Sequence, residues 1–142
     1  MPIISKRKYG KEDGVAAVEF AILTPVLLLM LLGMLAYGIY FGAAHSVQQL
    51  AADAARTSIA GLDANERDSL VRTFIDNNAR DYVFIDARKL TYAIGDKPGD
   101  ASQYLVTIRY DASELPIWNL GVPLPSPGRT IGFTSVIRKG GL

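Results

Sequence analysis

The sequence predicts an α+β protein with a long N-terminal membrane-spanning helix, a second helix and a small antiparallel β-sheet of about three strands. Residues 20–52 contain no Asp, Glu, Lys or Arg. Residues 64–81 repeat apolar side chains every three or four positions, and residues 90–137 hold three stretches in which apolar and polar side chains alternate. The chain has no cysteine. Packing on the long helix, or assembly with other subunits, must therefore stabilise the folded part.

Length and charge divide the 142-residue chain into three expected parts. Residues 1–14 form a basic leader, and residues 15–60 form the long helix, with a transmembrane segment at about 15–40. Residues 61–142 form a small extracytoplasmic α+β domain. A net charge of +1 argues against a nucleic-acid partner, because nucleic-acid binders usually carry a strong basic excess.

Basic residues are distributed unevenly around the apolar stretch. Those before it are Lys6, Arg7, Lys8 and Lys11, and the next along the chain is Arg56. Because Lys and Arg near a span favour the cytoplasmic side, we expect a single-pass protein with its N-terminus in the cytoplasm.

The predicted span contains three helix-specific features. As a helix, residues 15–40 would be about 37–39 Å long, enough to cross a ~30 Å hydrocarbon core with some tilt. Pro25 lacks the N–H that would bond the carbonyl of Ala21, so a kink is expected there. Gly38 and Gly42 form a GxxxG pattern, which lets two helices approach closely, although glycine is also simply tolerated in apolar helices.

An acid stands near the start of the span, five residues after a glycine. A carboxylate at membrane depth is costly unless it is paired, so Glu19 is a candidate functional residue. If the chain were cut after Gly14, Val15 would become a new amino terminus and Glu19 its fifth residue, about one helical turn away.

The segment Gly14-Val15-Ala16-Ala17-Val18-Glu19-Phe20-Ala21 resembles the class 3 signal peptide of type IV pilins and pseudopilins. With Pro25-Val26-Leu27-Leu28-Leu29 it is especially similar to the TadE-like minor pseudopilins of the tight adherence (Tad, Flp-type) pilus system. Basic leader, glycine, Glu at plus five, Phe at plus six and a spanning apolar run coincide, and this part of the resemblance covers roughly residues 6–60. The resemblance implies a pilin-like fold.

The resemblance also implies a function and partners. A prepilin peptidase would cut between Gly14 and Val15, and the subunit would wait in the bacterial inner membrane. A platform protein and an ATPase would then bring it to other pilin subunits, in a pilus used for surface adhesion. Glu19 and Phe20 would serve assembly and register. A minor role is expected because major pilins of this branch are much shorter.

The helical pattern continues beyond the span. Apolar residues at three- and four-residue intervals extend the first helix to about Ala60, with Gly61 as its stop. Asp63 caps a second helix that runs from about Ala64 to Asp81, with Glu66 completing a capping box. Its charges at four-residue steps predict a solvated helix face and no functional site: Asp68, Arg72, Asp76 and Arg80.

The last third contains three predicted strands and one apolar, proline-rich loop. The strands are predicted from residues that alternate with a period of two: Leu90, Tyr92 and Ile94, then Tyr104, Val106, Ile108 and Tyr110, then Ile131, Phe133, Ser135 and Ile137. Residues 95–100 form the turn between the first two strands. Four prolines predict no regular structure over residues 115–128, and this loop covers its own core, with Trp118 as plug, or contacts a partner or the membrane surface.

No pattern for catalysis, a metal or a cofactor is present. His45 is the single histidine, and without cysteine it cannot make a usual zinc site. Asp96, Asp100 and Asp111 could approach one another at the end of the sheet as a calcium site, but solvated turn acids are the favoured interpretation. We therefore expect neither an enzyme nor a cofactor.

Two other accounts of the N-terminal segment are compatible with parts of the pattern. A conventional secretory signal could end at the small residues before His45, but the apolar run exceeds the usual ~7–15 residues. An uncleaved, single-span envelope adaptor would keep its leader and has no need of Gly14. Cleavage at Gly14 separates that adaptor from a pilin.

Overall fold

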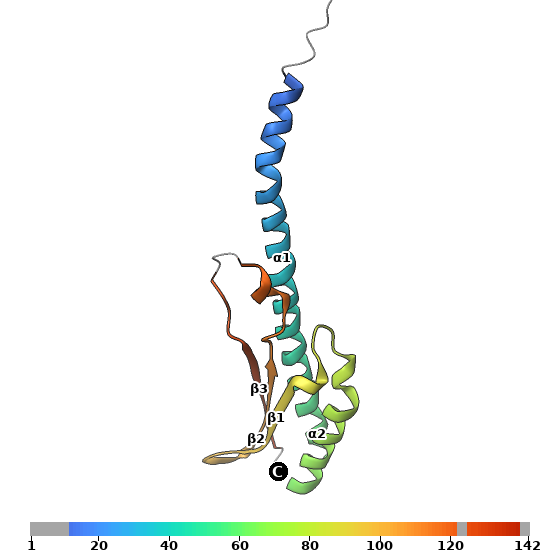
Figure 1. Cartoon of the computed structure of the whole chain (residues 1–142). Coiled ribbons are helices and arrows are strands. Elements are labelled where there is room, and N and C mark those ends of the chain that lie inside the picture. Colours follow the sequence, from blue (N-terminus) through green and yellow to red (C-terminus); the bar gives the residue numbers. More distant parts are fainter. Residues whose placement is uncertain (1–11, 122–124, 140–142) are drawn as a thin grey trace, which may run out of the picture. The chain divides into compact units, whose positions relative to one another are not determined.

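The computed structural model describes residues 12–121 and 125–139, with the side chains of residues 12 and 13 left out. The chain divides into two units, one up to Leu35 and one from Ala36 onward. Most of the expected leader, residues 1–11, lies outside the described residues. The helix α1 spans Glu12–Thr57 without interruption at Pro25 and is followed by a 3-10 turn at Ser58–Ala60 (Figure 1).

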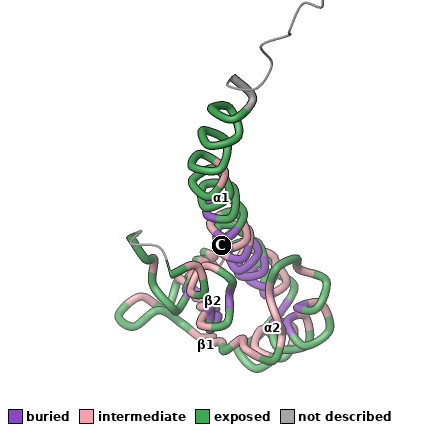
Figure 2. The backbone as a smooth tube through the Cα atoms, turned by 45° about the horizontal axis from the view of Figure 1, so that its top comes forward, coloured by how far each residue is buried: buried purple, intermediate pink, exposed green. Residues whose placement is uncertain are grey.

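The two parts of α1 differ in burial. Up to Leu35 almost every apolar side chain is exposed, and this part is long and apolar enough to cross a membrane. From Ala36 one face is buried, as Figure 2 shows for the second half of the helix. The buried α1 residues are Ala36, Tyr40, Ala43, Ser46, Val47, Leu50, Ala51, Ala54 and Ala55. Many are alanines, and small side chains let other elements pack close to a helix.

The second helix, α2, spans Ala64–Asn78 and ends in a 3-10 turn at Ala79–Asp81. Asp63 caps it by accepting from Glu66 N at 2.8 Å, while the Glu66 carboxylate accepts from Leu62 N at 2.7 Å. These bonds satisfy N–H groups that have no partner inside the helix. The predicted second helix and its cap are confirmed.

Three antiparallel strands form one sheet in the order β1-β2-β3: β1 spans Leu90–Lys97, β2 spans Asp100–Asp111 and β3 spans Thr130–Arg138. The register places Tyr92 beside Ile108, and Ile108 beside Phe133. These three side chains belong to the alternating sets from which the strands were predicted, and all pack in or against the core. The predicted α+β fold with a three-stranded antiparallel sheet is therefore confirmed.

The hairpin between β1 and β2 is tighter than predicted. β1 continues to Lys97, which pairs with Asp100, so only Pro98 and Gly99 remain in the turn. Gly99 has φ +82 and Gly95 has φ +153, backbone conformations that residues with a side chain rarely adopt. A register shift between Asp96 and Lys97 accommodates the twist at this end of the sheet.

Two expectations about local structure are corrected. Of the four charges expected on a solvated face of α2, Asp68 is half-buried and accepts from the Tyr104 hydroxyl at 2.5 Å, whereas the other three, Arg72, Asp76 and Arg80, are exposed as predicted. The loop after β2 contains a 3-10 turn at Pro116–Asn119. Proline fits there because the first turn of a helix does not use its N–H.

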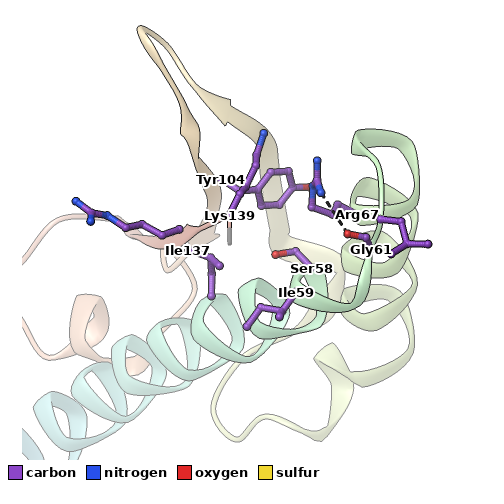
Figure 3. Close-up of a pocket in the computed structure, with 9 residues that line it drawn as sticks. Ser58, Ile59, Gly61, Arg67, Tyr104, Ile137 and Lys139 are labelled. Carbon is purple, nitrogen blue, oxygen red and sulfur yellow. Dashed lines mark hydrogen bonds between the residues drawn. The ribbon is translucent and has the colours of Figure 1, made fainter. Parts of the chain in front are cut away.

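The corner between α1 and α2 is closely packed around Gly61. A Cβ built on Gly61 would lie 2.7 Å from the backbone nitrogen of Arg67 and 2.9 Å from its Cα. The Arg67 side chain folds back so that Nη1 donates to Gly61 O at 3.2 Å (Figure 3). An open cavity of about 240 Å³ adjoins this corner, and its lining includes Ser58, Tyr104 and Ile137.

A hydrogen bond between a tyrosine and a carboxylate connects the segment after α2 to α1. It is expected to make the free energy of unfolding decrease at alkaline pH. The Tyr82 hydroxyl donates to Asp53 Oδ2 at 2.8 Å. Burial, followed by the hydrogen bond and charge of Asp53, raises the pKa of Tyr82 from 10.0 to about 12. Because this pKa is raised on folding, the bond's contribution is complete below pH 10 and is lost as pH rises toward 12.

We therefore expect Tyr82→Phe to lose less stability than the wild type between pH 10 and pH 12. Thermal unfolding of both proteins across this range measures the difference. Tyr104, whose pKa is also raised by burial and by Asp68, remains in both proteins and provides a common background. An identical alkaline loss in the two proteins would show that the Tyr82–Asp53 bond does not contribute.

Candidate assembly and membrane site

The Gly14–Val15 bond lies inside the first turns of α1. The helix begins at Glu12, three residues before the expected start at Val15. Helix ends open easily, and glycine is a poor helix former, so this bond lies where α1 unwinds at lowest cost. A Cβ built on Gly14 would meet no atom within 4 Å. The position can therefore accept a side chain without a steric change in the described residues.

Glu19 is an exposed carboxylate on an otherwise apolar surface. It follows Val15 by one helical turn, and residues at this spacing lie on the same helix face. Its apolar neighbours Val15, Val18 and Phe20 are 61–70% exposed. Within the part of the chain that the structure describes, Glu19 takes part in no ion pair.

Pro25 lies in the middle of this exposed apolar stretch. Helical geometry continues through Pro25, and the Thr24 hydroxyl donates to Phe20 O at 2.6 Å, inside the same turn. The hydroxyl thus bonds one of the carbonyls near the position where proline removes a donor. The expected kink at Pro25 stays a prediction.

The two glycines of the GxxxG pattern have different surroundings. A Cβ on Gly38 would meet nothing within 4 Å, so this face of α1 is open. A Cβ on Gly42 would lie 2.6 Å from Phe84 Cδ2, because the Phe84 ring lies directly on this glycine. A second helix can approach Gly38 freely, whereas at Gly42 it would have to displace the Phe84 ring.

The loop after β2 returns to α1 through two tyrosines. The Tyr40 hydroxyl donates to Gly128 O at 2.9 Å, and the Tyr37 hydroxyl donates to Pro125 O. Trp118 packs partly buried against the core, and its Nε1 donates to Ala112 O at 2.6 Å. The Trp118 ring therefore covers part of the core and leaves part of its own surface accessible. Residues 122–124 of this loop lie outside the described residues.

The acids weighed as a calcium site do not come together. Asp100 and Asp111 are the two ends of β2, which places them about 37 Å apart at 3.4 Å per residue. Each binds within its own turn: Asp100 accepts from Ser102 N at 3.0 Å and Asp111 from Ser113 N at 3.0 Å. The hydrogen bonds from the Ser102 and Ser113 hydroxyls, followed by these backbone bonds, hold the pKa of each carboxyl below its usual range. The idea that the three acids share one end of the sheet is wrong.

One residue that the sequence patterns did not single out, Phe84, contacts α1 at Gly42. Phe84 has φ +65, which is uncommon for a residue with a large side chain, and its ring is 51% exposed. No periodicity marks it, because Phe84 lies in a loop and meets Gly42 from 42 residues further along the chain. The two tyrosines that contact the loop after β2 could have been found from the sequence. Tyr37 and Tyr40 follow a long apolar run, and tyrosine is enriched where a membrane span ends.

The described residues form a long apolar N-terminal helix with a carboxylate near its start, a second helix and a small antiparallel sheet, and the long helix is apolar enough to cross a membrane. The family model described as TadE-like protein matches residues 14–56, so this segment is TadE-like, as the resemblance predicted. Comparison with curated proteins and with solved structures gives no match.

Proposed function

We propose that this chain is a minor pilin or pseudopilin of a Tad-type pilus, processed between Gly14 and Val15 and taking part in pilus assembly and surface adhesion. The observation that carries the proposal is Glu19, an exposed carboxylate one turn after Val15 on a TadE-like apolar helix. Cleavage would create a cationic amine at Val15. In apolar surroundings each charge is costly alone, and pairing removes much of that cost.

The paired charges would act in assembly. Before assembly, the subunit would be held in the inner membrane by α1, with its N-terminus in the cytoplasm. In the filament, Glu19 would pair with the Val15 amine of its own or a neighbouring subunit and set the axial register of adjacent helices, with Phe20 packing beside it. Gly38, where α1 is open, would let a neighbouring helix approach closely.

The partners follow from this sequence of steps. A membrane prepilin peptidase would read the basic leader and Gly14, and the assembly platform with its ATPase would move the processed subunit. The other pilin subunits would contact α1 along its exposed apolar side chains, which have no partner among the described residues.

Cleavage is tested by substituting the glycine at the cut. We expect Gly14→Val to retain the leader, because the peptidase would require glycine there, while the described fold is undisturbed by a Cβ at this position. Intact mass and N-terminal sequencing of protein from native membranes, with and without the peptidase, measure the effect.

Ala17→Val adds a similar side chain three residues past the cut and is the matched control. Wild-type protein that starts at Val15 only when the peptidase is present would support the proposal. A wild-type chain that keeps its leader in both strains would contradict it and favour an uncleaved, membrane-anchored envelope adaptor.

A further inference from the structure

We propose that the end of the α+β unit next to the apolar helix lies in the lipid headgroup region, held there by a collar of apolar side chains. The collar consists of Tyr37, Phe41, Val83, Phe84 and Trp118. They come from three separate segments: α1, the loop after α2 and the loop after β2. This proposal requires α1 to enter a bilayer, but it does not require leader cleavage or filament assembly.

Hydrogen bonds bring the loop after β2 to the start of the collar. Tyr40 binds Gly128 O, and the next residue, Arg129, has its carbonyl bonded by Ala112 N at 2.8 Å. Ala112 O in turn accepts from Trp118 Nε1 at 2.6 Å. Trp118 is thus connected to the first turn of α1 beyond Leu35 by a short series of bonded groups.

The loop after α2 contacts the next stretch of α1, at Gly42 and Ser46. The Ser46 hydroxyl donates to Val83 O at 2.6 Å, and the Phe84 ring lies on Gly42. Val83 and Phe84 nevertheless remain 63% and 51% exposed. The left-handed backbone conformation at Phe84 is unfavourable in free energy, and a loop that only faced water would have no reason to adopt it. This conformation keeps two apolar side chains at the end of the unit, where water alone gives them no favourable contact.

Chain connectivity identifies lipid as the partner of the collar. Tyr37 follows the last residue of the apolar unit, Leu35, by two positions, and Gly42 is about 10 Å beyond Leu35 along α1. The exposed apolar residues from Val15 to Leu35 would make a helix of roughly 30 Å, the thickness of the hydrocarbon core. The collar then begins at the headgroup layer, where Tyr and Trp are preferred.

The charges around the collar agree with a lipid surface. Residues 115–128 contain no charged side chain, and the guanidinium of the next residue, Arg129, lies 4.8 Å from the Trp118 ring centroid. An arginine beside an interfacial tryptophan can reach lipid phosphate while its stem covers the ring. Glu114, just before the loop, is already paired with Lys89.

The chain offers a direct test because Trp118 is its single tryptophan. The full-length protein is reconstituted in phosphatidylcholine vesicles with and without bromine near the top of the acyl chains, which quenches tryptophan at short range. We expect brominated lipid to reduce Trp118 emission, and the emission maximum to be blue-shifted.

Two further single-tryptophan variants show which part of the molecule is close enough to the lipid to be quenched. Phe84→Trp in a Trp118→Phe background places the fluorophore on the second loop, and we expect it to be quenched as well. Leu62→Trp in the same background is the matched control, because Leu62 is 91% exposed and lies past the far end of α1, at least 24 Å beyond Phe41 along the helix. We expect no quenching there.

Absence of quenching at Trp118 or at the Phe84 reporter would overturn the proposal and assign that part of the collar to a protein partner. Equal quenching at the Leu62 reporter would also overturn it, since the whole unit would then lie on the bilayer. Thermal unfolding of each variant establishes that the reporters are on folded protein.

Discussion

Replacing Glu19 by alanine is expected to leave leader removal intact and to reduce incorporation of the subunit into filaments by about a hundredfold or more. The physical reason is that the cleaved chain would carry an uncompensated Val15 amine into apolar surroundings. Removing one partner of a buried ion pair costs roughly 3–5 kcal/mol, which corresponds to more than a hundredfold in an equilibrium. The measurement is the ratio of the subunit in sheared filaments to the subunit in membranes.

Three variants separate charge from shape in this experiment. Glu19→Gln keeps the side-chain length and should assemble as poorly as Glu19→Ala, whereas Glu19→Asp keeps the charge and should recover part of the assembly. Val18→Ala is the matched control, because Val18 is adjacent, 61% exposed and apolar. Normal filament incorporation of Glu19→Ala would refute the pairing role without bearing on cleavage at Gly14.

The substitution Gly61→Ala is expected to destabilise the α+β unit by about 1–3 kcal/mol, the usual cost of forcing extra atoms into a packed site. Gly61 has φ −78 and ψ 130, which alanine adopts readily, so backbone strain is not the cause. The cause is contact: the new Cβ would lie 2.6–2.9 Å from Cγ, N and Cα of Arg67. Two of these atoms belong to the backbone of α2, so the first turn of that helix must move.

Thermal unfolding in detergent checks this prediction, with an expected fall in Tm of about 4–8 °C for each kcal/mol. Gly132→Ala is the matched control, because a Cβ there would make ordinary contacts at 3.6 Å with Arg109 Cγ and 3.8 Å with Ile108 O. An unchanged Tm in Gly61→Ala would mean that the α1–α2 corner can relax at little cost.

Local patterns explain why so much of the fold could be predicted from sequence. Helical spacing and the Asp63 cap depend on residues within a few positions of each other, and the alternation in the strands depends on a period of two. Even the register of β2 and β3 follows the apolar sets, since a slip of one residue would turn every apolar side chain of a strand outward. The Gly14–Glu19 spacing is equally local.

Long-range contacts explain what could not be predicted. Asp68 belongs to a regular charge pattern, yet Tyr104 lies opposite it from a strand 36 residues later. The acids Asp100 and Asp111 are near in sequence, but an extended strand separates them by its full length. The position of Phe84 on Gly42 depends on a left-handed backbone in a loop, which no pattern of apolar residues encodes.

The apolar N-terminal helix with its TadE-like start, the second helix and the three alternating strands could all be read from the amino-acid sequence. These features are local, and each repeats within a few residues. Folding determines which loops meet α1 beyond Leu35: residues 125–128 reach Tyr37 and Tyr40, and the Phe84 ring lies on Gly42. The reason is physical: the hydrogen bonds and close packing that bring these loops to α1 join residues that are distant in the chain, and they form only when the core of the unit is complete.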